Sequence, residues 1–332
     1  MQMEVDQNFL DSLEHSLSSE RLDAYRVYFN VSDDTEAYGA YMWNKSVGSA
    51  FYPLLQAVEI SFRNAVYGAG TKLFSGNREW FRSNKIMSRS AYKTIKYKYG
   101  DDQPKRDTAG NLVRQRGKVQ TTYVPFTPTP SAASVVAGLT FGFWVQLCTR
   151  HYDDSVTNSS LWPRGIPIAF PNAKGVDATR GSIHKRFNFI KGFRNRVGHH
   201  EPLWKIKDSF DGGGQLIRQG PTTPEQSIVR LNEYIDLMEG ALKWMSLDRA
   251  KFVKEAGYIA HLRSVCSMQA LDMYMKRSTD PVLLHSLHSQ MQSQLESLGN
   301  PSGTYLITIP ERDPVKETRF VLDVRAVKLP QT

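Results

Sequence analysis

Cysteine is scarce in this sequence, because its 332 residues include only Cys148 and Cys266. Two thiols are too few for a disulfide scaffold or a cysteine-rich zinc site. The first residues, MQMEVDQNFLDSLEHSL, lack the basic and apolar regions of a secretory signal, so we expect a cytoplasmic protein. Hydrophobic residues make up 40% and charged residues 23% of the chain, which excludes collagen-like, mucin-like and wholly disordered proteins.

A hydrophobic run long enough to cross a membrane is also missing. Residues 119–149 carry no charge, but their densest apolar part, 132–147, has only 16 residues and contains polar side chains. A spanning helix needs about 20 predominantly apolar residues. We therefore predict no membrane contact, and a buried core helix that begins after Pro130 with Ser131 as its N-cap.

Positive charge is abundant but unevenly distributed. The formal net charge is +9, yet residues 1–40 contain nine acidic and two basic residues, a local charge of −7. Residues 41–120 contain fifteen Lys/Arg and five Asp/Glu, and residues 178–200 contain six Lys/Arg and no acid. Such basic regions suit a polyanionic partner, although a merely basic soluble protein has the same composition.

Apolar periodicity predicts a mainly α-helical fold, beginning with one or two short helices in residues 7–29. One longer helix ends near Gly68 and Gly70 and has an apolar stripe of Phe51, Leu54, Leu55, Val58, Phe62 and Ala65. Another opens at Thr222 or Thr223, before Pro224 and Glu225, and has an apolar face of Ile228, Leu231, Ile235, Met238 and Leu242. Residues 251–298 also favour helix. Trp144, Trp162 and Trp204 are expected in the core.

Two polar segments, residues 100–118 and 208–224, are expected to be loops. The pattern changes from Gly303 onward, where TYLITI and TRFVLDVRAVKL are separated by the turn sequence PERDP. Alternating side chains around such a turn predict a small C-terminal β-hairpin.

A basic segment, residues 78–118, contains twelve Lys/Arg and four acids. Residues 78–99 are expected to form one helix with a cationic stripe interleaved with Trp80, Phe81, Tyr92 and Tyr97. The stripe consists of Arg82, Lys85, Arg89, Lys93 and Lys96. Cations that bind phosphate beside aromatic rings that stack on bases are typical of RNA binding. A solvated face, or a partner for the acidic N-terminal residues, would explain the same stripe.

The segment 194–199 combines Arg194, Asn195 and His199 in an R-N-x-x-x-H unit. Asn195 and His199 are four residues apart and share a face of a helix, whereas His200 is turned away by about 100°. Histidine can move protons near neutral pH, and an arginine can hold two phosphoryl oxygens. Asn195 can orient the imidazole or the phosphate. These residue types suit metal-free cleavage of RNA, although so short a pattern also arises by chance.

One motif histidine per chain is not enough for a reaction that needs both a general acid and a general base. The 2′-OH must lose a proton to attack phosphorus, and the leaving 5′-oxygen must gain one. A two-fold dimer would bring two copies of the motif together and supply both roles.

Three sequence blocks occur together and in order: YMWNKSVGSAFYPLLQAVEISFRNAVY at 41–67, ASVVAGLTFGFWVQL at 133–147 with LW at 161–162, and FRNRVGHHEPLW at 193–204. Over about residues 8–250 the chain resembles the Abi-like (AbiD/AbiF) abortive-infection family, part of the HEPN superfamily with its R-x(4–6)-H motif. The resemblance implies a HEPN-type helical bundle, a homodimer and a metal-independent endoribonuclease. It would act as a toxin-like effector in antiviral defence, with Arg194 and His199 as its catalytic pair.

The remaining candidate residues lie around the motif or in the first block. Glu59, Arg63, Asn64 and His200 are supporting candidates, and an ordinary i, i+4 ion pair would equally explain Glu59 and Arg63. Further RNA-binding candidates are Lys185, Arg186 and Arg196. His184 could touch the substrate, but exposure without function is the simpler interpretation. We expect no cofactor and no metal, because the pairs His199/His200 and His285/His288 lack carboxylate or Cys partners at useful spacing.

The predicted organisation is an Abi-like HEPN domain in residues 1–250 and a helical extension in residues 251–332 that ends in the hairpin. The first would contain acidic helices in 1–40, the basic insertion 78–118 and the motif 194–199. Two alternatives stay open. The protein could be a non-catalytic HEPN dimer that holds a structured or antitoxin RNA. It could also be a scaffold whose hairpin docks a protein.

Overall fold

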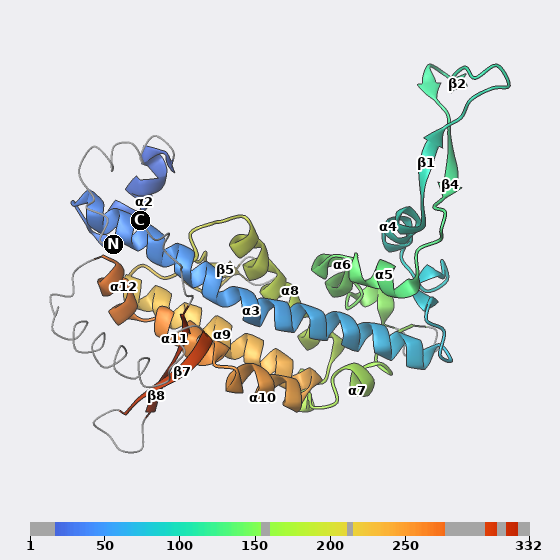
Figure 1. The fold of residues 1–332 in the computed structure, drawn as a ribbon. Coiled ribbons are helices and arrows are strands. Elements are labelled where there is room, and N and C mark those ends of the chain that lie inside the picture. The colour runs from blue at the N-terminus through green and yellow to red at the C-terminus, as the bar shows by residue number, and fades with distance from the viewer. Residues whose placement is uncertain (1–16, 154–159, 211–214, 276–302, 311–316, 325–332) are drawn as a thin grey trace, which may run out of the picture. The chain divides into compact units, whose positions relative to one another are not determined.

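The computed structural model describes residues 17–153, 160–210 and 215–275, and the strand residues 303–310 and 317–324. Within these ranges the fold is mainly helical, as the sequence predicted (Figure 1). The helices are α2 (Ser19–Phe29), α3 (Asp34–Leu73), α4 (Arg89–Tyr99), α5 (Ala132–Ala137), α6 (Phe141–Gln146), α7 (Ile166–Ala169), α8 (Arg180–Gly198), α9 (Pro224–Met245), α10 (Leu247–Glu255), α11 (Tyr258–Val265) and α12 (Met268–Tyr274).

The other elements are short. Single 3-10 turns are η1 (Trp80–Arg82), η2 (Arg150–Tyr152) and η3 (Gly175–Asp177). The strands are β1 (Gly100–Pro104), β2 (Arg114–Gln115), β3 (Lys118–Val119), β4 (Thr121–Pro125), β5 (Ser209–Phe210), β6 (Leu216–Arg218), β7 (Gly303–Pro310) and β8 (Glu317–Val324). They form two-stranded antiparallel pairs only: β1 with β4, β2 with β3, β5 with β6, and β7 with β8.

The chain divides into two compact units. Unit 1 contains Met1–Leu55, Arg194–Glu239 and Ala250–Thr332, and unit 2 contains Gln56–Phe193 and Gly240–Arg249. Each of the three longest helices, α3, α8 and α9, therefore contributes residues to both units.

An aromatic cluster forms the core of unit 1 around Trp204. The Trp204 ring lies 5.3 Å from Tyr25 and 5.4 Å from Phe29, both edge to face, and Phe29 also contacts Trp43. All four side chains are buried, and such aromatic pairs each add about 0.5–1.5 kcal/mol beyond their buried area. This cluster places the residues that follow α8 against α2 and the first half of α3.

A second aromatic cluster forms the core of unit 2. Phe62 of α3 stacks on Phe187 of α8 with ring centroids 3.8 Å apart, and Phe141 and Phe170 close the sides. Trp162 extends the cluster through Phe170. Trp144, Trp162 and Trp204 are all buried, so their prediction as core residues is confirmed.

The two long apolar stripes predicted from the sequence are confirmed. In α3 every residue of the stripe is buried except Ala65, which is partly exposed, and the helix continues to Leu73. In α9 the whole predicted face is buried, and the helix begins at Pro224. The hydroxyl of Thr223 accepts the backbone N–H of Gln226 at 3.3 Å, so Thr223 caps this helix.

The predicted core helix in 132–147 is two helices. Ser131 caps α5 as expected, its hydroxyl accepting the Ser134 N–H at 3.1 Å, but α5 ends at Ala137. Thr140 then caps α6 by accepting the Phe143 N–H at 3.2 Å. Gly138 and the second N-cap, Thr140, therefore divide the helix that the apolar composition predicted as continuous.

Residues 78–99 do not form the single helix that was predicted. Trp80 and Phe81 are fully buried, and this packing holds the short turn η1. Helix α4 starts again only after Ser88, whose hydroxyl accepts the Ala91 N–H at 3.3 Å. Tertiary packing of two aromatic residues therefore overrides the helical spacing of the cations.

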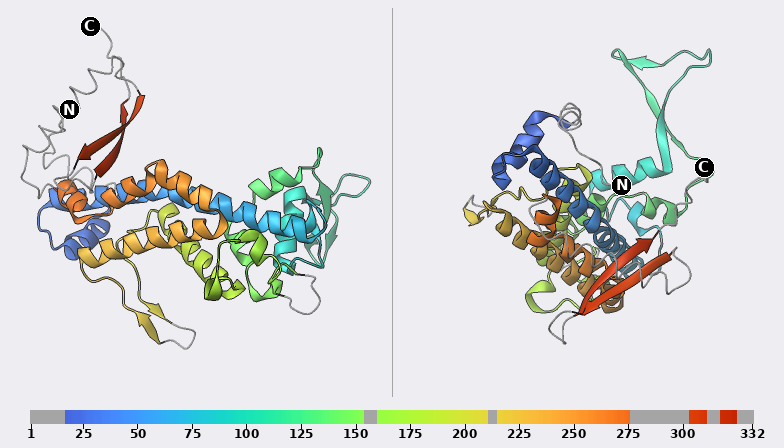
Figure 2. Two further views of the ribbon diagram at one scale, coloured as in Figure 1. Left: turned by 90° about the horizontal axis from the view of Figure 1, so that it is seen from below. Right: turned by 60° about the vertical axis from the view of Figure 1, so that its left-hand side comes forward.

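The predicted loop at 100–118 belongs to a β-hairpin. Strands β1 and β4 pair in register from Gly100↔Pro125 to Pro104↔Thr121, and Figure 1 and Figure 2 show this hairpin projecting from the end of α4. We call residues 100–125 the arm. Most of its side chains are exposed, so it lacks the apolar alternation that reveals a strand.

The second predicted loop contains the short pair β5 and β6. The C-terminal hairpin is confirmed, because β7 and β8 pair antiparallel from Gly303↔Val324 to Pro310↔Glu317. The helical predictions for residues 7–16 and 276–298 lie outside the described residues.

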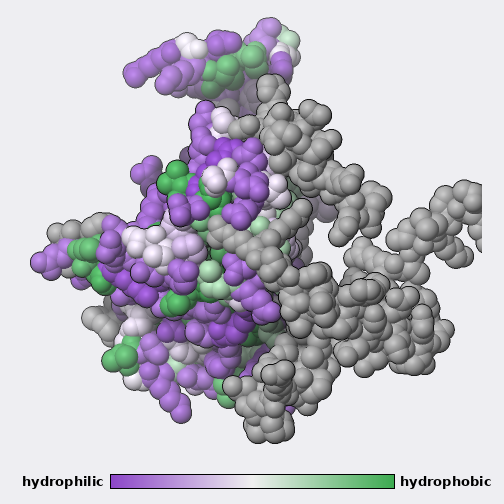
Figure 3. Space-filling view, turned by 90° about the vertical axis from the view of Figure 1, so that its left-hand side faces the viewer, coloured by the Kyte–Doolittle hydropathy of each residue, from purple (hydrophilic) through white to green (hydrophobic). Residues whose placement is uncertain are grey.

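The described helices include none that is long and apolar enough to cross a membrane. On the face drawn in Figure 3, hydrophilic side chains predominate among the coloured residues, and hydrophobic ones lie in small separate groups.

Candidate functional site

Helix α8 carries the motif and is oriented by its buried face. Ile183, Phe187, Ile190 and Phe193 are buried, at the spacing of a helical apolar stripe. The opposite side is exposed, with residues alternately four and three apart along one line, which we call the open stripe. It consists of Gly181, Lys185, Asn188, Gly192, Asn195 and His199.

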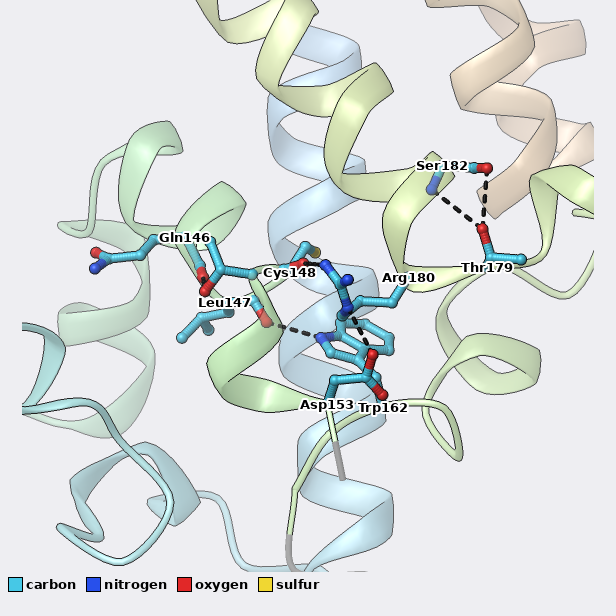
Figure 4. A network of polar contacts seen from close by, with 9 residues as sticks. Gln146, Leu147, Cys148, Asp153, Trp162, Thr179, Arg180 and Ser182 are labelled. Carbon is cyan, nitrogen blue, oxygen red and sulfur yellow. Dashed lines mark hydrogen bonds and ion pairs between the residues drawn. The ribbon is translucent and has the colours of Figure 1, made fainter. Parts of the chain in front are cut away.

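Polar contacts fix the start of α8 within unit 2 (Figure 4). The Arg180 guanidinium donates to the Asp153 carboxylate at 2.8 Å and to the Cys148 carbonyl oxygen at 3.0 Å. Thr179 Oγ1 accepts the Ser182 N–H at 3.1 Å, which supplies an N-cap. Because several residues hold its first turn, α8 has little freedom to rotate about its axis.

The end of α8 turns sharply just after the motif. The His199 N–H donates to the Asn195 carbonyl oxygen at 2.8 Å, so His199 still continues the last helical turn. His200 has a left-handed backbone with φ of 56°, which ends the helix and sends its side chain in another direction. The left-handed backbone of His200 therefore explains why the side chains of His199 and His200 diverge, as predicted.

Arg196 ties the residues after α8 back onto the helix. Its guanidinium lies 3.3 Å from the Glu201 carboxylate and donates to the Lys205 carbonyl oxygen at 2.8 Å and to that of Pro202. This side chain was a candidate RNA ligand, and its donors are now seen to hold the loop.

The loop 199–206 is also anchored from α3 and α9. The buried Asn44 side chain accepts the Leu203 N–H at 2.7 Å. From α9, the fully buried Ser227 hydroxyl donates to the Trp204 carbonyl oxygen at 2.9 Å. Breaking a buried hydrogen bond of this kind leaves a donor or acceptor without a partner, which lowers the stability of the fold by about 1–3 kcal/mol.

Arg194, Asn195 and His199 all have exposed side chains at this fixed end of α8, inside unit 1. The C-terminal end of a helix carries a partial negative charge that favours cations. The geometry therefore presents an arginine, an amide and a histidine to solvent on a rigid support.

The other basic residues of α8 differ in their surroundings. Lys185 is exposed on the open stripe, whereas the Arg186 guanidinium lies 3.8 Å from the centre of the Trp244 ring and 4.0 Å from Asp177. Burial lowers the pKa of Arg186, and Asp177 opposes that shift. Arg186 is thus packed within unit 2. For His184, burial and the charges of Arg180 and Lys191 lower the pKa.

The supporting candidates of the first block lie on the part of α3 that belongs to unit 2. The Arg63 guanidinium donates to the Ala137 carbonyl oxygen at 3.4 Å, while Glu59 is partly exposed and Asn64 exposed. This contact between Arg63 and α5 fits a structural role for Arg63.

The predicted cationic stripe is split by the break before α4. Arg89, Lys93 and Lys96 share one face of α4, whereas Arg82 belongs to η1 and Lys85 to the turn between the two. Arg82 pairs with Glu79 at 3.2 Å, and Lys96 with Asp102 at 3.6 Å. Of the interleaved aromatics, Trp80 and Phe81 are buried and Tyr97 donates to Asp102, which leaves Tyr92 exposed.

Neither cysteine is placed for nucleophilic chemistry. Both are buried, and burial raises the pKa of each thiol, that of Cys266 to about 12. In the ranges that the structure describes, no group of three or more His, Cys, Asp or Glu is arranged to hold a metal ion.

The sequence model of the family described as Abi-like protein matches residues 9–205, which include α3, the arm, the whole of α8 and all but the last residue of its loop. The chain belongs to the Abi-like family. Comparison with curated proteins and with solved structures found no match. Membership associates this Abi-like protein with abortive infection.

Two residues that hold the loop after the motif in this Abi-like protein were not predicted from its sequence. They are Asn44 and Ser227, and neither stands out by its residue type. For Asn44 a signal existed, because it lies in the block YMWNKS that accompanies HHEPLW. The two blocks meet in space through Asn44 and Leu203. For Ser227 the signal was its position, because it is a polar residue beside the apolar face of α9.

Proposed function

We propose that this Abi-like protein is a metal-independent HEPN-type endoribonuclease that acts as an abortive-infection effector. The observation that carries the proposal is the presentation of Arg194, Asn195 and His199, exposed together at an end of α8 that the following loop fixes. A mobile helix end would not hold these groups within the roughly 0.5 Å that a productive catalytic geometry requires.

The chemistry assigns one role to each side chain. His199 takes the proton of the RNA 2′-OH, whose oxygen attacks phosphorus and forms a 2′,3′-cyclic phosphate. The bond to the 5′-oxygen breaks, and that oxygen gains a proton from a second acid. Arg194 stabilises the charge that collects on the phosphoryl oxygens, and Asn195 orients the imidazole or the phosphate.

The second acid is His199 of another copy in a two-fold dimer. The open stripe of α8 supports such a partner, because a Cβ built on Gly192 would meet nothing within 4 Å. An exposed glycine costs a helix about 1 kcal/mol relative to alanine, and it permits a close approach by another helix. Sedimentation velocity tests this point: the wild type should be a dimer and Gly192→Arg a monomer.

The decisive variants are His199→Ala and Arg194→Ala. In EDTA, the wild type should cleave RNA and each variant should be at least about 100-fold slower. That is the usual contribution of a proton-transfer group for His199 and of a charge-stabilising donor for Arg194. His261→Ala, which removes an exposed histidine of α11, should cleave like the wild type. Expression should arrest growth for the wild type and not for His199→Ala. Cleavage by both motif variants at the wild-type rate would overturn the proposal.

A non-catalytic RNA-binding dimer that holds a structured or antitoxin RNA is the second candidate. It is favoured by Arg89 and Lys93, which within the described residues have no carboxylate within 4.0 Å. Tight, salt-dependent RNA binding by purified protein that never cleaves would select this function over the nuclease.

A further inference from the structure

A cavity of about 300 Å³ lies where the arm leaves α4, within unit 2, and its lining includes none of the motif residues. That volume is at the lower end of ligand pockets and suits a group the size of a nucleobase. Its lining is unusual because three of six residues are tyrosines and two are cations. The lining residues are Arg82, Tyr92, Ile95, Lys96, Tyr99 and Tyr123.

The wall formed by the arm is fixed to α4. The Tyr123 hydroxyl of β4 donates to the Lys96 carbonyl oxygen at 2.8 Å. Gly100 makes this approach possible, since a Cβ there would lie 2.6 Å from the Tyr123 ring and 2.4 Å from the Val124 carbonyl oxygen. The cavity is therefore built by specific packing of strand on helix.

Both cations lie over aromatic rings of the lining. Arg82 Cζ is 4.2 Å from the centre of the Tyr99 ring, and Lys96 Nζ is 4.4 Å from that of Tyr123. Cation–π contacts of this kind hold the charged groups at the cavity. Burial, and a hydrogen bond to Glu79, raise the pKa of Tyr99 to about 12, so its ring stays neutral.

Tyr92 is the exposed ring of the cavity, with 38% of its surface accessible. It lies on α4 between Arg89 and Lys93, both of which are exposed. Among the described residues neither of these two cations has an acidic side chain within 4.0 Å. An accessible aromatic face is thus flanked by positive charge that no acidic side chain of the described residues neutralises.

We propose that this cavity binds one unpaired base of an RNA strand, stacked on Tyr92, with the neighbouring phosphates on Arg89 and Lys93. The proposal rests on the proposed function in taking RNA as the ligand. Aromatic rings stack on bases of any identity, while Arg and Lys bind the backbone, so the cavity captures single strands without reading sequence.

A strand fits better than a free nucleotide, because the positive charge continues beyond the cavity. The arm carries five further exposed cations: Lys105, Arg106, Arg114, Arg116 and Lys118. A paired duplex is excluded as the preferred ligand, since its bases are stacked on each other and cannot enter.

The test measures binding of a fluorescently labelled single-stranded RNA to the full chain carrying His199→Ala, by anisotropy. Adding Tyr92→Ala should weaken binding about ten-fold, the typical loss of one base–aromatic stack. Tyr92→Phe should bind within about two-fold, because it retains the ring. Tyr258→Ala, which removes a similarly exposed tyrosine of α11, should have no effect.

Salt dependence separates stacking from charge. Arg89→Gln and Lys93→Gln should each reduce the slope of log affinity against log salt by about 0.7, whereas Tyr92→Ala should leave it unchanged. Equal affinity for a free mononucleotide, or for the same RNA in a duplex, would overturn the proposal, as would wild-type binding by Tyr92→Ala.

The outcomes also separate this proposal from the nuclease. Cleavage that depends on His199 together with Tyr92→Ala binding like its parent would retain the nuclease and remove the cavity. Binding that depends on Tyr92 without any cleavage by the wild type would do the reverse. If the wild type bound no RNA, both proposals would fall.

Discussion

The end of α8 and the arm are built in opposite ways. Asn44, Ser227 and Arg196 hold the loop after the motif from three elements, and the aromatic cluster around Trp204 packs beneath it. The arm is attached at its base through Gly100 and Tyr123 and is exposed along most of its length. Rigid support suits chemistry, whereas an exposed basic ribbon suits the capture of a long polymer.

The largest expected effect concerns the fixed region. Asn44→Ala leaves the buried Leu203 N–H without its acceptor and should lower the free energy of unfolding by about 1–3 kcal/mol. Asn64→Ala, at an exposed asparagine of the same helix, should unfold like the wild type. Thermal denaturation measures both, and an unchanged Asn44→Ala would contradict the view that this loop is held by that contact.

The next effect concerns the packing that precedes the arm. A Cβ on Gly70 would lie 2.2 Å from the Trp80 indole, so Gly70→Ala should destabilise by about 1–3 kcal/mol through overpacking. Gly68 lies two residues earlier in α3 with nothing within 4 Å of such a Cβ. Gly68→Ala should therefore stabilise by up to about 1 kcal/mol. Equal effects in denaturant titration would show that Trp80 does not pack as described.

The arm itself should contribute binding and little stability. Replacing residues 105–120 by Asn-Gly would join Pro104 to Thr121, which already pair, through a two-residue hairpin turn. We expect a change in unfolding free energy within about 0.5 kcal/mol, as for exposed substitutions, and a clear loss of RNA affinity and salt dependence. If the shortened protein were clearly less stable but bound RNA like the wild type, the arm would support the fold and would not bind RNA, which contradicts this comparison.

The smallest effect is a pH dependence. Burial and the charges of Arg180 and Lys191 lower the pKa of His184 in the folded protein. The unfolded chain therefore takes up this proton at a higher pH, so stability is lost as the pH falls below the ordinary value of 6.5. His184→Gln should flatten the dependence of unfolding free energy on pH in that range. An identical pH dependence in the two proteins would show that His184 does not contribute.

Much of the fold followed from periodicity, and the exceptions have identifiable causes. The stripes of α3 and α9 bury one face each, so their spacing is visible in the sequence. The arm is exposed on both faces and gives no such signal. One local sign is Arg116-Gly117, whose positive φ angles of 48° and 76° form the tight turn between β2 and β3.

The candidate site divides in the same way. The motif residues were predicted from their residue types and spacing, and the structure places them at one helix end. Asn44 and Tyr123 were missed because their importance lies in contacts between segments distant in the sequence. The continuous helix at 78–99 was wrong for a related reason, since the burial of Trp80 and Phe81 depends on the rest of unit 2.

The most direct test of the account is the chemical identity of the RNA ends after incubation with pure protein in EDTA. Mass spectrometry of a short RNA should find 2′,3′-cyclic phosphate and 5′-hydroxyl ends with the wild type, and intact RNA with His199→Ala. Products with 5′-phosphate and 3′-hydroxyl ends, or the same products from His199→Ala, would contradict the assignment of catalysis to the end of α8.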